Sequence, residues 1–449
     1  MQVFIRATIA DNPYLDNTEY EQSLAALDGR ADHSRQTTLN HMTLATPPGD
    51  ATAFKPRHVP ALDGLRAIAV LMVLLAHFKE ATPRWIWQVL HQGGFGVYLF
   101  FVLSGFLITR ILLSEKNKPA YFRNFYARRT LRIFPLYYGV LALQFWVLLP
   151  IFPTPHILAD ARYQGWLWGY GYNILTAVKG RLFFASDWMV LGHFWSLAVE
   201  EQFYVVWPFI VLALCRETLL KLCIGIVALT PILRLAFYAA GANRYWVTMF
   251  TICQMDSLAL GAMLACLESS GRLNAIVPTA RRVVLGVGAI LVICSFFYPR
   301  SPEAMLPLIF YHGAVALFFG AIVALAACGV FRWLDHRVLR EVGQKSYGMY
   351  VFHIPLLVLA IRYIHLPSRL QQWTSHPYLA DMIFFSSMII ITYVVAFISY
   401  NAYEKHFLRL KRFFRGDQSR KPKIPDMQNA VLVQDGRCEL ARDETAVSP

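Results

Sequence analysis

Charged residues are scarce in this chain. Asp, Glu, Lys and Arg make up only 16% of its 449 residues, while hydrophobic residues make up 56%. A typical soluble domain carries about 25% charged residues, and a single soluble core cannot bury so much apolar surface. The composition excludes a soluble enzyme, a disordered protein and a coiled coil, and it predicts an all-α polytopic membrane protein.

Metal-binding and disulfide patterns are missing from the sequence as well. None of the seven cysteines stands in a CxxC or Cys/His spacing, so we expect no metal site and no disulfide framework. The first 60 residues contain no long apolar run of the kind found in secretory signals. We therefore expect a flexible cytoplasmic tail over residues 1–60 and a basic, then polar, cytoplasmic tail over 405–449.

Apolar stretches of a length near that of a membrane-spanning helix fill the chain between these tails. Their approximate ranges are 62–79, 94–113, 133–152, 191–215, 219–239, 247–268, 283–298, 307–331, 346–364 and 379–401. With a cytoplasmic N-terminus, 31 of the 42 Lys and Arg residues fall in cytoplasmic segments, 9 in outer segments and 2 within spans. This bias follows the positive-inside rule. It predicts a transmembrane domain over 61–404 with about ten helices and both termini in the cytoplasm.

The first predicted span carries three polar side chains, Asp63, Arg66 and His77. Arg66 and His77 are 11 residues apart in sequence, which puts them on one helix face, about 16 Å apart along the axis. Asp63 can pair with Arg66 at the i, i+3 spacing and is a candidate substrate contact. An interfacial ion pair is the alternative for Asp63 and Arg66, whereas an ionisable group as deep as His77 is usually functional.

Arginines gather just before the third predicted span, at Arg128, Arg129 and Arg132. Anchoring by the positive-inside rule explains one or two of them. The cluster equally suits a phosphorylated ligand arriving from the cytoplasm, because guanidinium groups bind phosphate through paired hydrogen bonds. We keep both interpretations open and name Arg129 and Arg132 as candidate cofactor contacts.

The fourth predicted span combines a polar stripe with two adjacent carboxylates. His193, Ser196, Glu200 and Tyr204 recur at three- and four-residue steps and so line one face, with Glu201 about 100° away. Adjacent glutamates inside a span are costly unless they are paired or hydrated, so we predict a functional role for both. Ser196 and Tyr204 are predicted substrate contacts.

Two further regions offer candidate substrate contacts. In the ninth predicted span, Ser346, Tyr350 and His353 share a face. Either polar contacts between helices or substrate binding explains them, and His353 is the candidate substrate contact. The predicted outer loop 153–190 is rich in aromatic residues, including Trp166 and Trp168. One explanation for these rings is an interfacial aromatic belt. The other is stacking of their flat faces on sugar rings.

Taken in order, these segments resemble the acyltransferase type 3 family of integral-membrane O-acyltransferases. The resemblance covers residues of about 60–405, and its ordered set of motifs is specific although no single one is decisive. The motifs are Arg66 with ten residues before His77, GG…FFVLSGFL at 93–107, RTLRIFP at 129–135, WSLAVEEQFY at 195–204 and SYGMYVFH at 346–353.

The resemblance implies a membrane enzyme that acylates hydroxyl groups of glycans, glycolipids or small molecules. It implies that His77 and Arg66 are the catalytic pair, and that acyl-CoA, most often acetyl-CoA, is a co-substrate rather than a permanently bound cofactor. Some relatives carry a further soluble acyltransferase domain after the last span, and we expect this membrane domain to act alone or with a separate partner. We expect a bacterial inner-membrane protein embedded in the lipid bilayer, with no nucleic-acid partner.

The residue types indicate how such a transfer would proceed. A sugar hydroxyl must lose its proton as it attacks a thioester, and a positioned imidazole such as His77 suits the role of general base. Either Glu200 or Glu201 would orient this base or balance its charge. The CoA phosphates would be held by three arginines: Arg66, Arg129 and Arg132.

Two other functional classes compete with this interpretation. A multi-pass transporter of a sugar or organic anion also carries intramembrane Glu, His and Arg residues, but it does not consume acyl-CoA. A polyprenyl-sugar glycosyltransferase would need acidic residues near its first outer loop, where this chain has only Glu80. The acceptor and the acyl group stay open at this stage.

Overall fold

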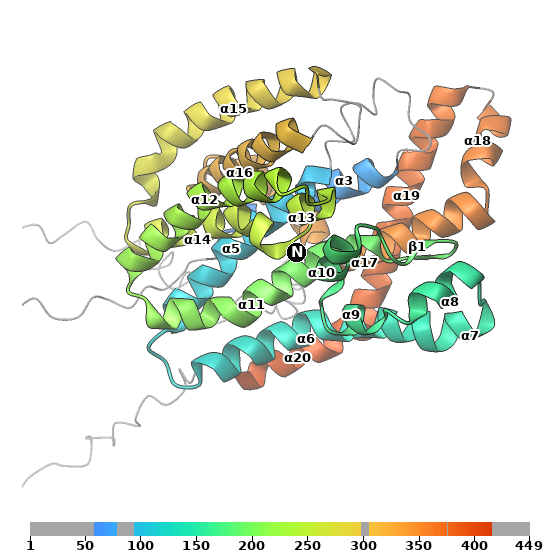
Figure 1. The fold of residues 1–449 in the computed structure, drawn as a ribbon, viewed down its shortest axis with the longest axis horizontal. Helices are drawn as coiled ribbons and strands as arrows, with labels where there is room; N and C mark the ends of the chain where they lie inside the picture. The colour runs from blue at the N-terminus through green and yellow to red at the C-terminus, as the bar shows by residue number, and fades with distance from the viewer. Residues whose placement is uncertain (1–57, 79–93, 298–304, 375, 415–449) are drawn as a thin grey trace, which may run out of the picture.

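The computed structural model describes residues 58–78, 94–297, 305–374 and 376–414. Almost all of the tail predicted over 1–60, and most of the tail predicted over 405–449, lie outside the described residues. Within them the chain is a bundle of helices with one small two-stranded sheet at the end that carries α7 and α8 (Figure 1). The all-α prediction is confirmed.

Long helices form the body of the bundle. In chain order they are α3 (Ala61–His77), α5 (Gly96–Glu115), α6 (Tyr121–Ala142), α11 (Trp195–Ala213), α12 (Arg216–Ala239), α14 (Met255–Ser269), α15 (Val277–Phe297), α16 (Met305–Ala327), α17 (Arg337–Val358) and α19 (Pro377–Ser399). Three of them continue as π-helical turns, α6 into η4 (Leu143–Leu148), α17 into η9 (Leu359–Tyr363) and α19 into η10 (Tyr400–Glu404).

Short elements connect these helices. The helical ones are α7 (Leu149–Ile151), α8 (Pro155–Ala161), α9 (Gly165–Trp168), α10 (Tyr172–Lys179), α13 (Arg244–Thr248), α18 (Leu366–Thr374) and α20 (Lys405–Arg409). Single 3-10 turns are η5 (Gly192–Phe194), η6 (Thr251–Gln254), η7 (Leu273–Ile276), η8 (Arg332–Asp335) and η11 (Leu410–Phe414). The strands β1 (Ala185–Ser186) and β2 (Met189–Val190) pair antiparallel, with Ala185 opposite Val190.

Helix length and hydropathy support fewer spans than the sequence predicted. Among the described residues, seven helical segments are long and apolar enough to cross a membrane, or eight if the bent pair Arg337–Tyr363 and Leu366–Thr374 is one span. The sequence predicted about ten. The difference lies in α3 and α14, whose 17 and 15 residues fall short of the roughly 20 that a span needs. The chain is a multi-pass membrane protein.

The short helix α3 lies inside the bundle, packed against α17, α5 and α16. Its contact with α17 is close because Gly343 has no side chain, and a Cβ there would lie 1.9 Å from the carbonyl oxygen of Asp63. Helices without intervening side chains can approach in this way inside a membrane. This close contact between α3 and α17 allows polar residues of the two helices to lie near one another.

Helices α5 and α14 also meet backbone to backbone. A Cβ at Gly105 would lie 1.9 Å from the carbonyl oxygen of Leu258, and a Cβ at Gly261 would lie 2.0 Å from that of Val102. Gly105 and Gly261 therefore serve tight helix packing.

Two buried ion pairs fix α14 at its two ends. Arg234 of α12 pairs with Asp256 at 2.8 Å, and Arg110 of α5 pairs with Glu268 at 2.5 Å. Both arginine side chains are at most 5% exposed. Removing one partner of such a pair leaves an uncompensated buried charge, so both pairs hold α14 against its neighbours.

The glycine contact between α5 and α14 gives a stability test. We expect Gly105→Ala to lower the free energy of unfolding by about 1–3 kcal/mol, because the added methyl group overlaps a carbonyl that cannot rotate away. Gly225→Ala on α12 is the control, since no atom lies within 4 Å of its Cβ position. Thermal unfolding in detergent would measure both, and equal melting temperatures for the two variants would refute the packing argument.

Candidate active site

A cavity of about 90 Å³ lies at the centre of the bundle, between α3, α5, α6, α11 and α17. Its lining mixes polar and apolar residues and comes from helices that are far apart in sequence. The predicted site residues among the lining are Arg66, Arg129, Arg132, Ser196, Glu200, Glu201 and Tyr204. Its other hydroxyl-bearing residues are Ser104, Ser346, Tyr347 and Tyr350.

Glu200 is held by a hydroxyl network that links α5 to α11. The hydroxyl of Ser104 donates to Glu200 Oε1 at 2.5 Å, and the hydroxyl of Tyr204 donates to Ser104 Oγ at 3.0 Å. The guanidinium of Arg129 lies over the Tyr204 ring, 4.7 Å from its centre. Glu201 lines the same cavity, and its Oε1 atom is buried without a hydrogen-bond partner among the described residues. The two glutamates therefore share one cavity despite their angular separation on the helix.

Three arginines line the cavity, one from α3 and two from α6. Arg66 donates to Asp63 at 3.2 Å, so the ion pair predicted from their spacing is present. Asp63 also lies 3.5 Å from His58 and is not among the residues that line the cavity. Arg129 and Arg132, one helical turn apart on α6, face the cavity beside Arg66. Three guanidinium groups from two helices thus converge on one polar space.

Three histidines meet at the opposite end of α3. The His77 and His353 rings are 5.0 Å apart at 65°, and the His193 and His353 rings are 4.9 Å apart at 73°. The sequence identified His77 and His353 as candidates and noted His193 only as a member of the α11 stripe. The contact arises because α3 ends at His77 where it crosses α17, and η5 turns His193 toward the same point.

Backbone carbonyls set the tautomers of two of these histidines. His77 Nδ1 lies 2.8 Å from the Val73 oxygen, and His353 Nδ1 lies 2.6 Å from the Tyr350 oxygen. A carbonyl oxygen only accepts, so each Nδ1 carries the proton and each Nε2 is the basic nitrogen of the neutral ring. Among the described residues, no group of three His, Cys, Asp or Glu side chains is placed to hold a metal ion.

Tyr350 joins the histidine cluster to the cavity. Its hydroxyl donates to the His193 carbonyl at 2.8 Å and lies 2.5 Å from the hydroxyl of Ser196. Its ring is 5.5 Å from those of both His193 and His353. His77 itself is not among the residues that line the cavity. The cavity lining therefore includes the arginines, Glu200 and Tyr350, and Tyr350 in turn contacts His193 and His353.

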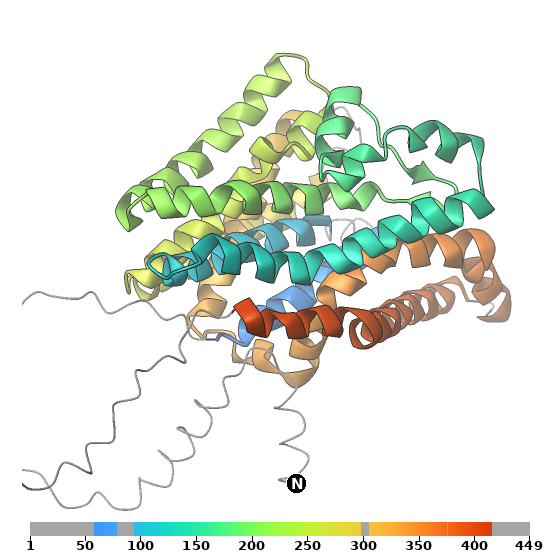
Figure 2. The ribbon, with the colours of Figure 1, turned by 90° about the horizontal axis from the view of Figure 1, so that it is seen from below.

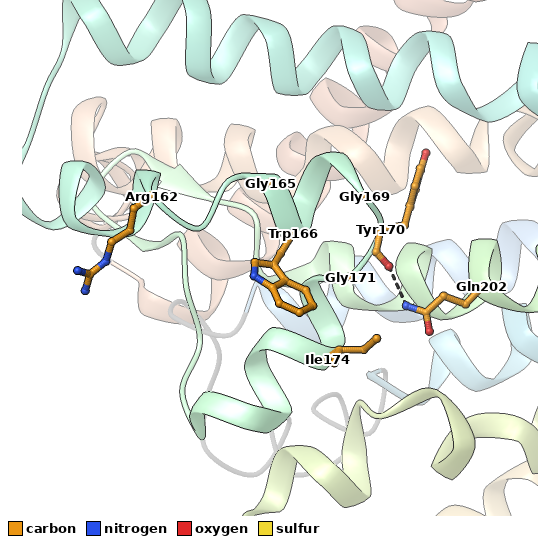
Figure 3. Close-up of a pocket in the computed structure, with 8 residues that line it drawn as sticks. All are labelled: Arg162, Gly165, Trp166, Gly169, Tyr170, Gly171, Ile174 and Gln202. Carbon is orange, nitrogen blue, oxygen red and sulfur yellow. Dashed lines mark hydrogen bonds between the residues drawn. The ribbon is translucent and has the colours of Figure 1, made fainter.

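A second, larger pocket opens beside α9 and α10, in the segment predicted as the outer loop (Figure 3). Its volume of about 490 Å³ is within the range of ligand sites. Trp166 forms one wall and is 42% exposed. The indole lies close to the backbone of Gly171, where a Cβ would come within 2.6 Å of the ring. Gln202 of α11 donates to the Tyr170 carbonyl at 2.7 Å and closes the inner side.

Trp168 lies away from this pocket although it is only two residues from Trp166. Its ring stacks between Tyr138, at 5.7 Å and 6°, and Trp146, at 5.2 Å and 19°. Tyr138 also donates to the Trp168 carbonyl at 3.0 Å. Residues two positions apart on the short helix α9 point to different sides. Trp168 therefore packs against α6 and η4, whereas Trp166 faces the pocket.

Tyr170 forms a boundary between this pocket and the bundle. Its backbone has a positive φ of 51°, and its ring stacks on Tyr137 at 4.2 Å. In Figure 3 its side chain points away from Trp166. Burial raises the pKa of the Tyr170 hydroxyl far above its ordinary value, so the group stays protonated and neutral.

The hydroxyl network around Glu200 can be tested through stability. We expect Ser104→Ala to lower the free energy of unfolding by about 1–3 kcal/mol, because the buried glutamate loses its donor. Ser114→Ala on the same helix is the control, since that hydroxyl only donates to the backbone oxygen of Ile111. Thermal unfolding in detergent compares them. A Ser104→Ala protein as stable as the control would mean that water replaces the serine.

Comparison with known proteins places this geometry in context. A family described as "Acyltransferase domain" matches residues 59–401. A peptidoglycan O-acetyltransferase of Listeria monocytogenes is 30% identical over 69% of this chain and 51% of its own length. A Bacillus subtilis protein named "Putative peptidoglycan O-acetyltransferase" is 29% identical over 78% of this chain and 55% of its own length. The chain spans about half the length of these relatives. No solved structure matches it.

Proposed function

The chain belongs to the acyltransferase type 3 family, and from this membership we propose that it transfers an acetyl group from acetyl-CoA to a hydroxyl of a glycan or glycolipid. The observation that carries the proposal is a cavity lined by three arginines and two glutamates, next to a cluster of three histidines that Tyr350 connects to it. A related protein is a peptidoglycan O-acetyltransferase, which makes a peptidoglycan-type glycan the first acceptor to test. The alternative of a transporter has no comparable support from the family.

His77 is the proposed general base. Its Nδ1 proton is engaged by the Val73 carbonyl, which leaves Nε2 as the atom that takes the proton of the attacking hydroxyl. The hydroxyl oxygen then bonds to the thioester carbonyl carbon, the carbon–sulfur bond breaks, and the proton passes to the CoA thiolate. His353 lies in edge contact with His77, and its buried Nε2 lacks a partner among the described residues. It is the nearest neighbour suited to share the positive charge of a protonated His77.

The arginine end is the proposed donor site. Arg66, Arg129 and Arg132 offer paired donors that match phosphate oxygens. Glu200 lies in the same cavity, bonded to Ser104 and close to the Arg129–Tyr204 stack, which supports a role in balancing the arginine charge. From this end the thioester arm would extend past Ser196 and Tyr350 toward His77.

The Trp166 pocket is the proposed acceptor site. An exposed indole beside glycine backbone offers a flat apolar face, and Arg162 offers a polar contact at its edge. In the ten-span arrangement predicted from the sequence, the positive-inside bias would put this segment outside and both termini in the cytoplasm. The donor would then enter from the cytoplasm of a bacterial inner membrane and the acceptor from the other side.

The role of His77 has a direct test. We expect His77→Ala to lower acetyl transfer by a factor of about 10²–10⁴, the usual contribution of a general base, while membrane levels stay normal. The assay follows label from acetyl-CoA into extracted glycan in isolated membranes. His156→Ala is the control, because that residue is exposed on α8. Transfer at the wild-type rate by His77→Ala would rule out this base.

Substitutions of the two tryptophans should have different effects. We expect Trp166→Ala to raise the KM for a chito-oligosaccharide acceptor about tenfold, which corresponds to about 1.4 kcal/mol, because a stacking surface is lost. CoA binding should not change. Trp168→Ala should instead lower the melting temperature, since its ring packs between Tyr138 and Trp146. An unchanged KM in Trp166→Ala would mean that the pocket does not bind the acceptor and has only a structural role.

A further inference from the structure

The side chains that line the Trp166 pocket indicate which kind of glycan fits it. Most of the wall comes from the segment between α8 and α10, which lies on the outside of the bundle (Figures 1 and 2). Glycine backbone, the Trp166 indole and the Ile174 side chain form much of its surface. The lining found among the described residues contains no carboxylate, and its one charged side chain is Arg162. The charge in the pocket wall is therefore positive.

The other polar side chains of the wall already have partners or point elsewhere. Gln202 Nε2 donates to the Tyr170 carbonyl at 2.7 Å and to Asn173 Oδ1 at 2.9 Å. Gln202 Oε1 accepts a hydrogen bond from the hydroxyl of Thr251. Because a carboxamide has only two N–H donors, Gln202 has none left for a ligand. The Tyr170 side chain points away from the indole (Figure 3).

Arg162, in contrast, keeps its donors available. Its side chain is exposed, and among the described residues no Asp or Glu lies within ion-pair distance of it. Its guanidinium stands 4.9 Å from the centre of the Tyr163 ring. The nearest acid in sequence, Asp160, accepts from Arg181 at 2.8 Å and from the Phe184 amide at 2.8 Å. Asp160 and Arg181 therefore neutralise each other, and the charge of Arg162 is left uncompensated.

The pocket thus combines a flat ring with a cation at its edge. In Figure 3 the indole nitrogen of Trp166 lies on the edge of the ring that faces Arg162. That nitrogen makes no hydrogen bond to another described residue. A sugar ring that stacks on the indole would bring a neighbouring substituent toward the guanidinium. Arginine binds carboxylates through two parallel hydrogen bonds, so an anionic substituent suits this place.

We propose that the acceptor is an acidic glycan, and that Arg162 binds a carboxylate on or next to the sugar that stacks on Trp166. The inference rests on the proposed function, because it names the class of acceptor for the same pocket. An anionic lipid headgroup would also bind an exposed arginine, and the test includes that outcome. The glycan is favoured because the pocket adds a stacking surface and a volume of about 490 Å³, which a contact with a headgroup does not require.

The test compares two ligands that differ in charge: the disaccharide of N-acetylglucosamine and N-acetylmuramic acid, and the methyl ester of its carboxylate. Each is titrated into the full chain in detergent by calorimetry. We expect wild-type protein to bind the acid about tenfold more tightly than the ester, as for one charge-assisted hydrogen bond. Arg162→Gln should lower the affinity for the acid about tenfold and leave that for the ester unchanged. Equal affinities of wild-type protein for acid and ester would overturn the proposal.

Three further variants show whether the effect belongs to this pocket. Lys179→Ala is the charge control, since Lys179 is exposed on the same outer segment but does not line the pocket. It should bind the acid as wild type does, and a tenfold loss would contradict a specific role for Arg162. Arg162→Lys should recover only part of the affinity, because an ammonium group lacks the forked donors. Trp166→Ala should weaken acid and ester equally.

These binding measurements need no acetyl-CoA, so they are independent of the proposed reaction. If membranes show no acetyl transfer but Arg162→Gln loses the preference for the acid, the reaction is wrong and the acidic-glycan site stands. If acid and ester are acetylated with equal kcat/KM, the reaction stands and this inference fails. Phosphatidylcholine nanodiscs with and without phosphatidylglycerol test the lipid. An Arg162→Gln protein that loses only phosphatidylglycerol binding would assign Arg162 to a headgroup and overturn the proposal.

Discussion

The constraint on which this structure depends is that polar groups inside the bundle must find partners on other helices. No water is available in the hydrocarbon region to satisfy them, so each buried donor or charge fixes a helix–helix contact. Arg234 with Asp256 and Arg110 with Glu268 do this for α14. The hydrogen bond from Ser104 to Glu200 fixes the contact between α5 and α11. The same contacts that stabilise the bundle therefore position the residues of the candidate site.

Charged groups are distributed unevenly over the candidate site. Its arginine-lined part and its histidine cluster therefore suit different chemistry. Guanidinium groups gather at one end of the cavity, and three imidazoles gather where α3 ends. Cations attract a phosphorylated compound, whereas neutral imidazoles are suited to proton transfer. Arg66 and His77 are separated by roughly three helical turns of α3. In the proposed function, this one short helix would carry a residue for each of the two tasks.

Much of the candidate site could be predicted from the spacing of residues along single helices. The rest depends on how the helices cross. The 11-residue spacing of Arg66 and His77, the Asp63–Arg66 pair and the membrane character of the chain are all readable from the sequence. The meeting of His77 with His353 is not, because it depends on the glycine contact of α17 with α3. Trp166 and Trp168 looked equivalent in sequence, but the four-residue helix α9 sends them to different surroundings.

The contact between Trp166 and Gly171 also bears on how such a protein could change over time. Backbone forms much of this pocket, and backbone shape is insensitive to most substitutions. Position 171 is an exception, because any side chain there would collide with the indole and displace it. A single codon change at this glycine would remodel the outer pocket while the buried helices kept their contacts. If this pocket binds the acceptor as proposed, acceptor preference would diverge among descendants of this chain while the contacts between the buried helices stayed the same.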